Sequence, residues 1–124
     1  MLVVLDTNFL LTCVKQKIDL FAQLAELCPG YKIILLPQVF GELLNLSKSK
    51  KAEGEAAAVA LQILEKKGIS PEKSKEIKAK SADAALLSFD APKNVIATLD
   101  RQLRAKFKSA SFLTIKGKKR IAFL

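Results

Sequence analysis

The sequence of 124 residues contains no histidine, and this absence excludes several kinds of active site. It rules out serine and cysteine nucleophiles that depend on a histidine base, general acid–base pairs built on histidine, and zinc sites with histidine ligands. The two cysteines, Cys13 and Cys28, are too few for a zinc site or a dense disulfide framework, and we expect both to be buried free thiols. If the chain is an enzyme, its chemistry must rest on carboxylates, for which a hard metal ion is the natural partner.

Nucleotide-binding loops and membrane spans are also missing from the sequence. There is no Gly-x-Gly-x-x-Gly motif and no Walker A loop, since Gly117-Lys118-Lys119 lacks both the spacing and the hydroxyl. No apolar run approaches the roughly 18 residues needed to span a bilayer. The apolar start is not typical of a secretory signal, because it lacks a basic leading segment and carries Asp6. We therefore expect a single soluble, cytoplasmic domain over residues 1–124, without a membrane partner.

The positive charge of the chain is concentrated near its C-terminal end. The formal net charge is +9, and residues 93–124 hold nine Lys or Arg against Asp100 alone. Residues 1–47, in contrast, hold three Lys against four acids. A basic stripe of this kind suits a polyanionic partner, because Lys and Arg neutralise phosphates. Charge alone does not distinguish this interpretation from a basic surface that only keeps the protein soluble.

Short apolar runs alternate with segments of helical periodicity along the whole chain. The sequence predicts strands at 2–5, 32–36, 94–98 and 112–115, with a short edge strand at 121–123. It predicts helices at 7–14, 20–27, 37–46, 52–67, 81–88 and 100–107, and an exposed connection at 70–78. This alternation is typical of an α/β fold. We expect a three-layer α/β/α sandwich around a parallel sheet of about four to five strands.

Four acidic residues stand in apolar surroundings rather than on polar helix surfaces. Asp6 ends the first strand, Glu42 lies in VFGELL, Asp83 lies in SADAALL and Asp100 follows VIATL. Because the carboxyl ends of parallel strands meet on one rim, Asp6 and Asp100 are expected to project there. Glu42 and Asp83 are expected in the first turns of helices that begin near that rim. Carboxylates that converge raise one another's pKa, and Mg²⁺ or Mn²⁺ would relieve the repulsion.

Taken singly, most of these acids have a simpler structural interpretation. Asp6 and Asp100 are suited to cap the helices that follow them, and Asp83 is favourable near a helix N-terminus. Glu42, flanked by Gly41 and two leucines, has no such explanation. Four coincidences of this kind are harder to accept than one acidic cluster.

Four motifs, in order along the chain, resemble the PIN domain, a fold of metal-dependent nucleases. They are VVLDTNFLL, LLPQVFGELLNL, SADAALLS and VIATLDRQLRAKF. The resemblance implies supporting roles for Asn8 and Thr98, whose polar groups can orient carboxylates or metal-bound water. It implies catalytic and metal-binding roles, with Mg²⁺ or Mn²⁺, for Asp6, Glu42, Asp83 and Asp100.

The segments KSKKAEGEAAAVALQIL and KKRIAFL are most similar to archaeal proteins related to the PIN nucleases of ribosomal RNA maturation. The expected function is a metal-dependent endoribonuclease that hydrolyses phosphodiester bonds in single-stranded or ribosomal RNA. With few aromatic residues, base stacking should be secondary to phosphate contacts. The residues expected to hold the RNA backbone are Arg101, Arg104, Lys106 and Lys108, with Lys116, Lys118, Lys119 and Arg120 as an extension.

Three other functions stay open or are disfavoured at this point. A toxin ribonuclease with an antitoxin partner would have the same chemistry, and a homodimer also stays open. A PIN scaffold that binds RNA without cutting it would have no reason to keep four acids in apolar surroundings. A phosphoacceptor receiver domain would need paired acids after the first strand, whereas Thr7 and Asn8 follow Asp6 here.

Overall fold

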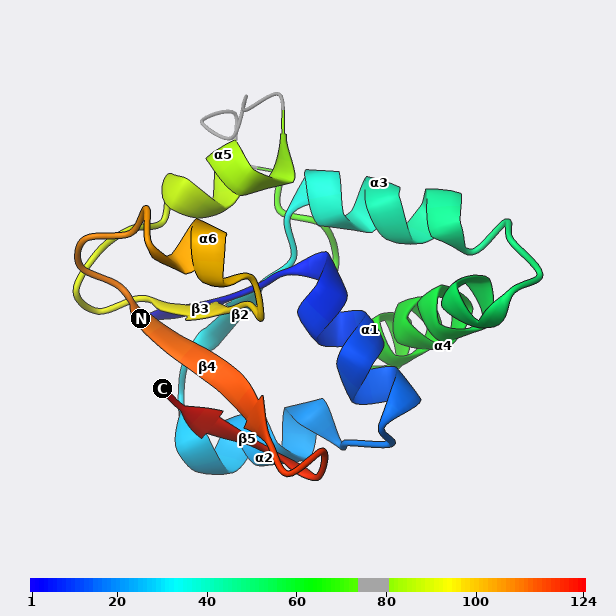
Figure 1. Cartoon of the computed structure of the whole chain (residues 1–124), viewed down its shortest axis with the longest axis horizontal. Helices are drawn as coiled ribbons and strands as arrows, with labels where there is room; N and C mark the ends of the chain where they lie inside the picture. Colours follow the sequence, from blue (N-terminus) through cyan, green and yellow to red (C-terminus); the bar gives the residue numbers. More distant parts are fainter. Residues whose placement is uncertain (74–80) are drawn as a thin grey trace.

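A computed structural model of the chain describes residues 1–73 and 81–124, which form a five-stranded sheet with helices around it (Figure 1). The strand order is β2-β1-β3-β4-β5. The strands β2, β1, β3 and β4 are parallel to one another, and β5 runs antiparallel to β4. The predicted α/β fold with a largely parallel central sheet is therefore confirmed. The strands are β1 (Leu2–Leu5), β2 (Lys32–Ile34), β3 (Val95–Ala97), β4 (Ser111–Lys116) and β5 (Arg120–Phe123).

The helices of the described residues follow the predicted order closely. Asp19 accepts a hydrogen bond from the amide of Ala22 and so caps its helix, as expected from the sequence. Pro37 occupies the first turn of the helix after β2, where its missing N–H costs nothing. The helices are α1 (Thr7–Lys15), α2 (Leu20–Leu27), α3 (Pro37–Leu46), α4 (Ala52–Lys66), α5 (Ala82–Leu87) and α6 (Arg101–Arg104).

Several elements are shorter than the sequence predicts, among them β2 and α6. β2 ends at Ile34, because Leu35 leaves the ladder to form an isolated bridge with Pro71. α6 ends at Arg104 rather than 107, since the backbone there tightens into turns that lead the chain back to β4. The predicted exposed connection at 70–78 lies mostly outside the described residues.

The core is centred on β1, which lies between β2 and β3. Val3, Val4 and Leu5 are completely buried, as expected for a central parallel strand covered on both faces. Cys13 and Cys28 are buried free thiols, as predicted. In the part of the chain that the structure describes, no helix has the length and apolar character to span a bilayer.

Gly54 allows the turn between α3 and α4 to pack directly on α4. A Cβ atom at this position would lie 1.8 Å from the carbonyl oxygen of Ser49 and 2.9 Å from that of Leu46, both in the backbone. Gly41, in the middle of α3, has nothing within 4 Å of the same position. Close packing therefore requires glycine at position 54 but not at position 41.

We expect Gly54→Ala to destabilise the fold by about 1–3 kcal/mol, the range for overpacked sites. Gly41→Ala should instead stabilise it by about 1 kcal/mol, because alanine is the better helix former. Urea unfolding of the two variants and the wild type measures both effects. Equal stability of the two variants would contradict the close approach at Gly54.

Candidate metal centre

Asp6 is the first residue after β1 and is buried, with 8% of the residue exposed. Its backbone N–H donates to the carbonyl oxygen of Ala97 (3.0 Å), which continues the ladder between β1 and β3 by one residue. Its Oδ1 accepts from the amide of Thr7 (2.8 Å) and its Oδ2 from the hydroxyl of Thr98 (2.7 Å). Both partners are neutral. The buried charge is therefore hydrogen-bonded but not compensated by these contacts.

Thr98 connects Asp6 with the end of β3. Its hydroxyl is fully buried, donates to Asp6 and accepts from the backbone amide of Asp100 (3.2 Å). The side chain that was expected to support a carboxylate is thus in contact with one. This chain of hydrogen bonds sets the spacing between the two acids that follow neighbouring strands.

The electrostatics of Asp6 show which other acids lie near it. Burial raises the pKa of the Asp6 carboxyl, hydrogen bonds from Thr98 and Thr7 lower it, and the carboxylates of Asp83 and Glu42 raise it further. Glu42 and Asp83 are both exposed. Asp83 lies in the first turn of α5, as expected. The prediction for Glu42 was wrong in detail, because it is the sixth residue of α3 and lies in the second turn.

Asp100 has a structural role that the sequence left open. Its Oδ1 accepts from the amides of Gln102 (3.0 Å) and Leu103 (3.1 Å), so Asp100 caps α6. Its second oxygen makes no hydrogen bond to the described residues. The cap and a ligand role for that second oxygen are compatible.

The four acids do not form a closed cluster in the structure. Within residues 1–73 and 81–124, no three Asp, Glu or Cys side chains are close enough to make a complete metal-binding group. The ion pairs of this part of the chain are Lys15–Glu53 and Lys32–Glu72, so no lysine or arginine neutralises Asp6. Asp6, Glu42 and Asp83 supply hard oxygen donors, and the negative charges of Asp83 and Glu42 act on Asp6. This donor set fits Mg²⁺ or Mn²⁺.

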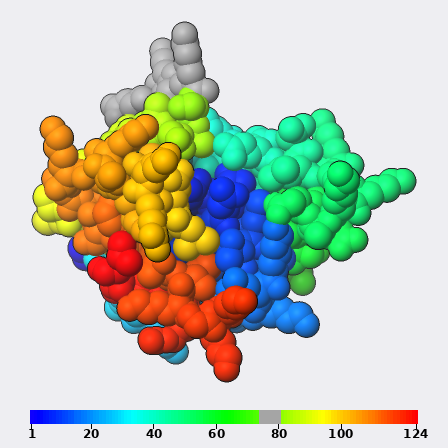
Figure 2. All heavy atoms as spheres, viewed as in Figure 1, coloured from blue at the N-terminus to red at the C-terminus, as the bar shows by residue number. Residues whose placement is uncertain are grey.

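The polar and basic residues expected near the site are divided between its rim and the open surface. Asn8 is exposed in the first turn of α1. The guanidinium of Arg104 is half-buried and its Nη1 donates to the carbonyl oxygen of Thr98 (3.3 Å), which holds this cation at the rim. The other three cations expected there are exposed: Arg101, Lys106 and Lys108. Figure 2 shows the segments of α1 and α6 beside each other on one face.

Asp90 organises the approach to β4, and sequence reasoning missed it. Its carboxylate accepts from the amides of Lys108 (2.7 Å), Ser109 (2.8 Å) and Ala110 (2.9 Å). These three hydrogen bonds lower the pKa of the Asp90 carboxyl. Its setting in SFDAPKN is typical of a loop, but no sequence pattern indicates a partner about twenty residues away.

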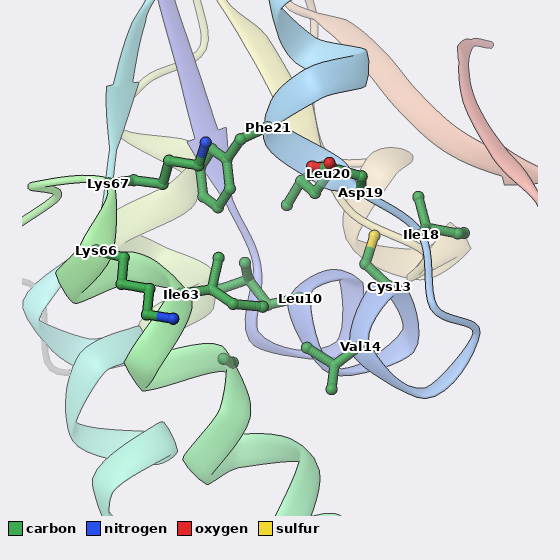
Figure 3. A pocket seen from close by; sticks show the side chains of 11 residues that line it. Leu10, Cys13, Val14, Ile18, Asp19, Leu20, Phe21, Ile63, Lys66 and Lys67 are labelled. Carbon is green, nitrogen blue, oxygen red and sulfur yellow. The ribbon is translucent and has the colours of Figure 1, made fainter.

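A pocket between α1, α2 and the end of α4 is a separate feature (Figure 3). It has a volume of about 290 Å³ and mainly apolar walls, including Leu10, Phe21 and Ile63. Burial raises the pKa of the Cys13 thiol in its wall to about 12, so this sulfur stays protonated at neutral pH. The pocket contains none of the four candidate acids.

The fold and the site can now be compared with known proteins. The sequence profile of a family described as PIN like domain matches residues 3–120. The chain belongs to this family. The resemblance that the four motifs predicted is thereby confirmed, and all four acids lie within the matched range.

A solved structure described as the PIN domain endonuclease Utp24 is similar to the PIN-like chain over nearly its whole length. The TM-score is 0.71 at 27% sequence identity, and the match covers 98% of this chain and 90% of the other. A comparison with curated proteins found no match.

A divalent cation is expected to stabilise the PIN-like fold through Asp6. The raised pKa means that ionised Asp6 costs folding free energy at neutral pH. In EDTA at pH 7, Asp6→Asn should therefore be at least as stable as the wild type. Mn²⁺ at about 100 times its dissociation constant should stabilise the wild type by about 2.7 kcal/mol and leave Asp6→Asn unchanged. Thermal unfolding measures this, with the exposed Glu26→Gln as a charge-matched control that keeps the shift.

The Asp90 hydrogen bonds predict that the stability of the fold depends on pH. A pKa lowered by folding adds stability above the ordinary value of 3.8, and this contribution is lost as the pH falls through the folded pKa. Asp90→Asn should unfold at a lower temperature than the wild type at pH 7, and the difference should shrink as the pH falls below 3.8. Thermal unfolding between pH 7 and 2.5 measures it. A difference that does not depend on pH would contradict a role for the charge.

Proposed function

We propose that the chain is a divalent-metal-dependent endoribonuclease. The observation that carries the proposal is the Asp6 carboxylate, buried with neutral hydrogen-bond donors only and faced by Glu42 and Asp83. A fold that keeps such an uncompensated charge needs a cation to relieve it. Membership of the PIN-like family and the similarity to a PIN domain endonuclease support the same activity.

The residues of the site have distinct tasks in this proposal. Asp6, Glu42 and Asp83 hold one or two cations, together with the free oxygen of Asp100. Bound Mg²⁺ or Mn²⁺ supplies activation of the attacking water and stabilisation of the leaving oxygen. Thr98 keeps the Asp6 carboxylate in one orientation through its hydroxyl. No histidine is needed for this chemistry.

The basic residues near α6 are proposed to receive the RNA backbone. Arg104 is held at the rim by the carbonyl oxygen of Thr98, and Arg101 is exposed at the start of the same helix. Lys106 and Lys108 follow on the loop that Asp90 fixes. We propose RNA, and ribosomal RNA in particular, on the basis of the sequence resemblance. No observation on the described residues favours an antitoxin partner or a homodimer, and neither is proposed.

Removal of Asp6 tests the proposal directly. We expect Asp6→Asn to slow cleavage of RNA by a hundredfold or more, as roughly found when a group that stabilises developing charge is lost. Thr98→Val keeps the shape and removes the hydroxyl, and should lower activity or metal affinity about 10–100-fold. Cleavage of end-labelled single-stranded and structured RNA is measured with Mn²⁺, with Mg²⁺ and with EDTA.

The controls separate the alternatives. Glu26→Gln removes a surface acid of α2 and should cleave like the wild type. Cleavage that persists in EDTA, or an unimpaired Asp6→Asn variant, would refute the mechanism. RNA binding by the wild type without cleavage under any metal condition would indicate a scaffold instead.

A further inference from the structure

We propose that the end of β4, the turn after it and the start of β5, residues 116–120, form a second contact site for RNA phosphates. We propose also that Gln23 on α2 positions this segment. The inference rests on the proposed function and deepens it. We refer to residues 116–120 as the basic hairpin. Four arguments from the structure support the proposal: its position, its charge, its backbone conformation and its attachment.

The register of the sheet places the basic hairpin beyond the level of the acidic site. Leu5, Ala97 and Leu113 lie side by side on β1, β3 and β4. Asp6 and Thr98 begin where the first two strands end, whereas β4 continues for three more residues to Lys116. At 3.3 Å per residue the hairpin therefore begins roughly 10 Å beyond Leu113, the residue of β4 that is level with Leu5 and Ala97. Figure 2 shows this hairpin, α1 and α6 on the same face of the molecule.

The charge on the hairpin is unfavourable for the fold alone. Residues 116–120 contain four cations and no acid, and all of them are exposed. Lys116 and Arg120 are direct partners in the antiparallel ladder. Like charges directly opposite each other destabilise a strand pair. The described ion pairs lie elsewhere and do not relieve this repulsion.

The backbone of the turn gives the same indication. Gly117 (φ 62°) and Lys118 (φ 57°) are both left-handed, and the amide of Lys119 donates to the carbonyl oxygen of Lys116 (3.3 Å). Two consecutive left-handed residues favour Asn or Gly, which tolerate this conformation at low cost. Lysine at position 118 keeps a positive charge at the tip against the conformational preference. Contact with a polyanion gives this charge a use.

Gln23 fixes the hairpin to the body of the protein. Its Nε2 donates to the carbonyl oxygen of Lys119 (3.3 Å), and its Oε1 accepts from the amide of Ile121 (2.6 Å). The two polar atoms of this one half-buried side chain thus bind the last residue of the turn and the second residue of β5. Gln23 contacts only backbone atoms of the hairpin and none of its charged side-chain groups, so it is a positioning residue. Its effect on RNA must pass through the hairpin.

The decisive variant is Lys118→Asn, because it separates stability from binding. Asparagine suits the left-handed backbone and removes one of the repelling charges, so thermal stability should rise. Affinity for a fluorescent single-stranded RNA, measured by anisotropy in EDTA, should fall about fivefold, as for loss of an exposed ion pair. The slope of log K against log salt should become shallower by about 0.7. Lys50→Asn, an exposed lysine in the turn between α3 and α4, is the charge-matched control.

Gln23→Leu tests the positioning role by steady-state cleavage. We expect KM for RNA to rise severalfold with kcat unchanged, because the reacting groups are not touched. The double variant of Gln23→Leu and Lys118→Asn should lose less affinity for RNA than the sum of the losses in the two single variants. Full additivity, or an equal fall in kcat, would overturn the positioning role.

The outcomes also separate this proposal from the proposed function. Unchanged affinity and salt slope in Lys118→Asn, or an equal loss in Lys50→Asn, would overturn the hairpin contact while leaving metal-dependent cleavage untouched. The converse outcome is also possible. If the wild type cleaves RNA with neither metal, but Lys118→Asn weakens RNA binding in EDTA, the nuclease proposal is refuted and the hairpin contact is supported.

Discussion

The burial of the Asp6 carboxylate is the constraint on which the rest of the site depends. β1 is completely enclosed, and Asp6 is the first residue after it, held by one amide and one hydroxyl. Those two hydrogen bonds prevent the charge from being an isolated buried ion, but they do not neutralise it. The nearest titratable groups on α3 and α5 are acids as well. The fold therefore concentrates negative charge where a fold selected only for stability would place an apolar or paired residue.

The sheet register gives this constraint its geometry. Asp6 donates its backbone N–H to Ala97, so the ends of β1 and β3 are level and Thr98 meets the carboxylate. Because side chains alternate between the two faces of a sheet, a slip of one residue would turn Thr98 away from Asp6. The parallel core thus supplies more than stability. It fixes two polar side chains at a distance that neither strand sets alone.

The sequence predicted the elements and the acidic residues better than the contacts that join them. Buried strands have continuous apolar runs, and the first charge marks the end of β1, so Asp6 was placed correctly directly after that strand. Asp100 lies three residues beyond the end of β3, at the start of α6, because β3 ends at Ala97. The contacts of Asp90 and Gln23 could not be predicted, because each joins segments that are distant in sequence and neither side chain belongs to a periodic pattern. Glu42 was placed one turn too early on α3 although the start of the helix at Pro37 was predicted correctly, because Glu42 is the sixth residue of the helix and a turn holds only 3.6 residues.

Basic residues on the surface and acidic residues around Asp6 would act differently on RNA in a nuclease of this kind. The chain is strongly basic overall, with a net charge of +9, so a polyanion is drawn to its surface at long range. Burial is the main cause of the raised Asp6 pKa, and the negative charges of Asp83 and Glu42 raise it further. These charges oppose the last step, because they also repel an approaching phosphate. In the proposed function, a divalent cation would relieve both repulsions at once and so couple metal loading to productive RNA binding. Exposed cations at α6 and at the basic hairpin can hold the backbone on either side without entering the acidic centre. In the proposed function, RNA would bind broadly through the exposed cations, and cleavage would require the metal.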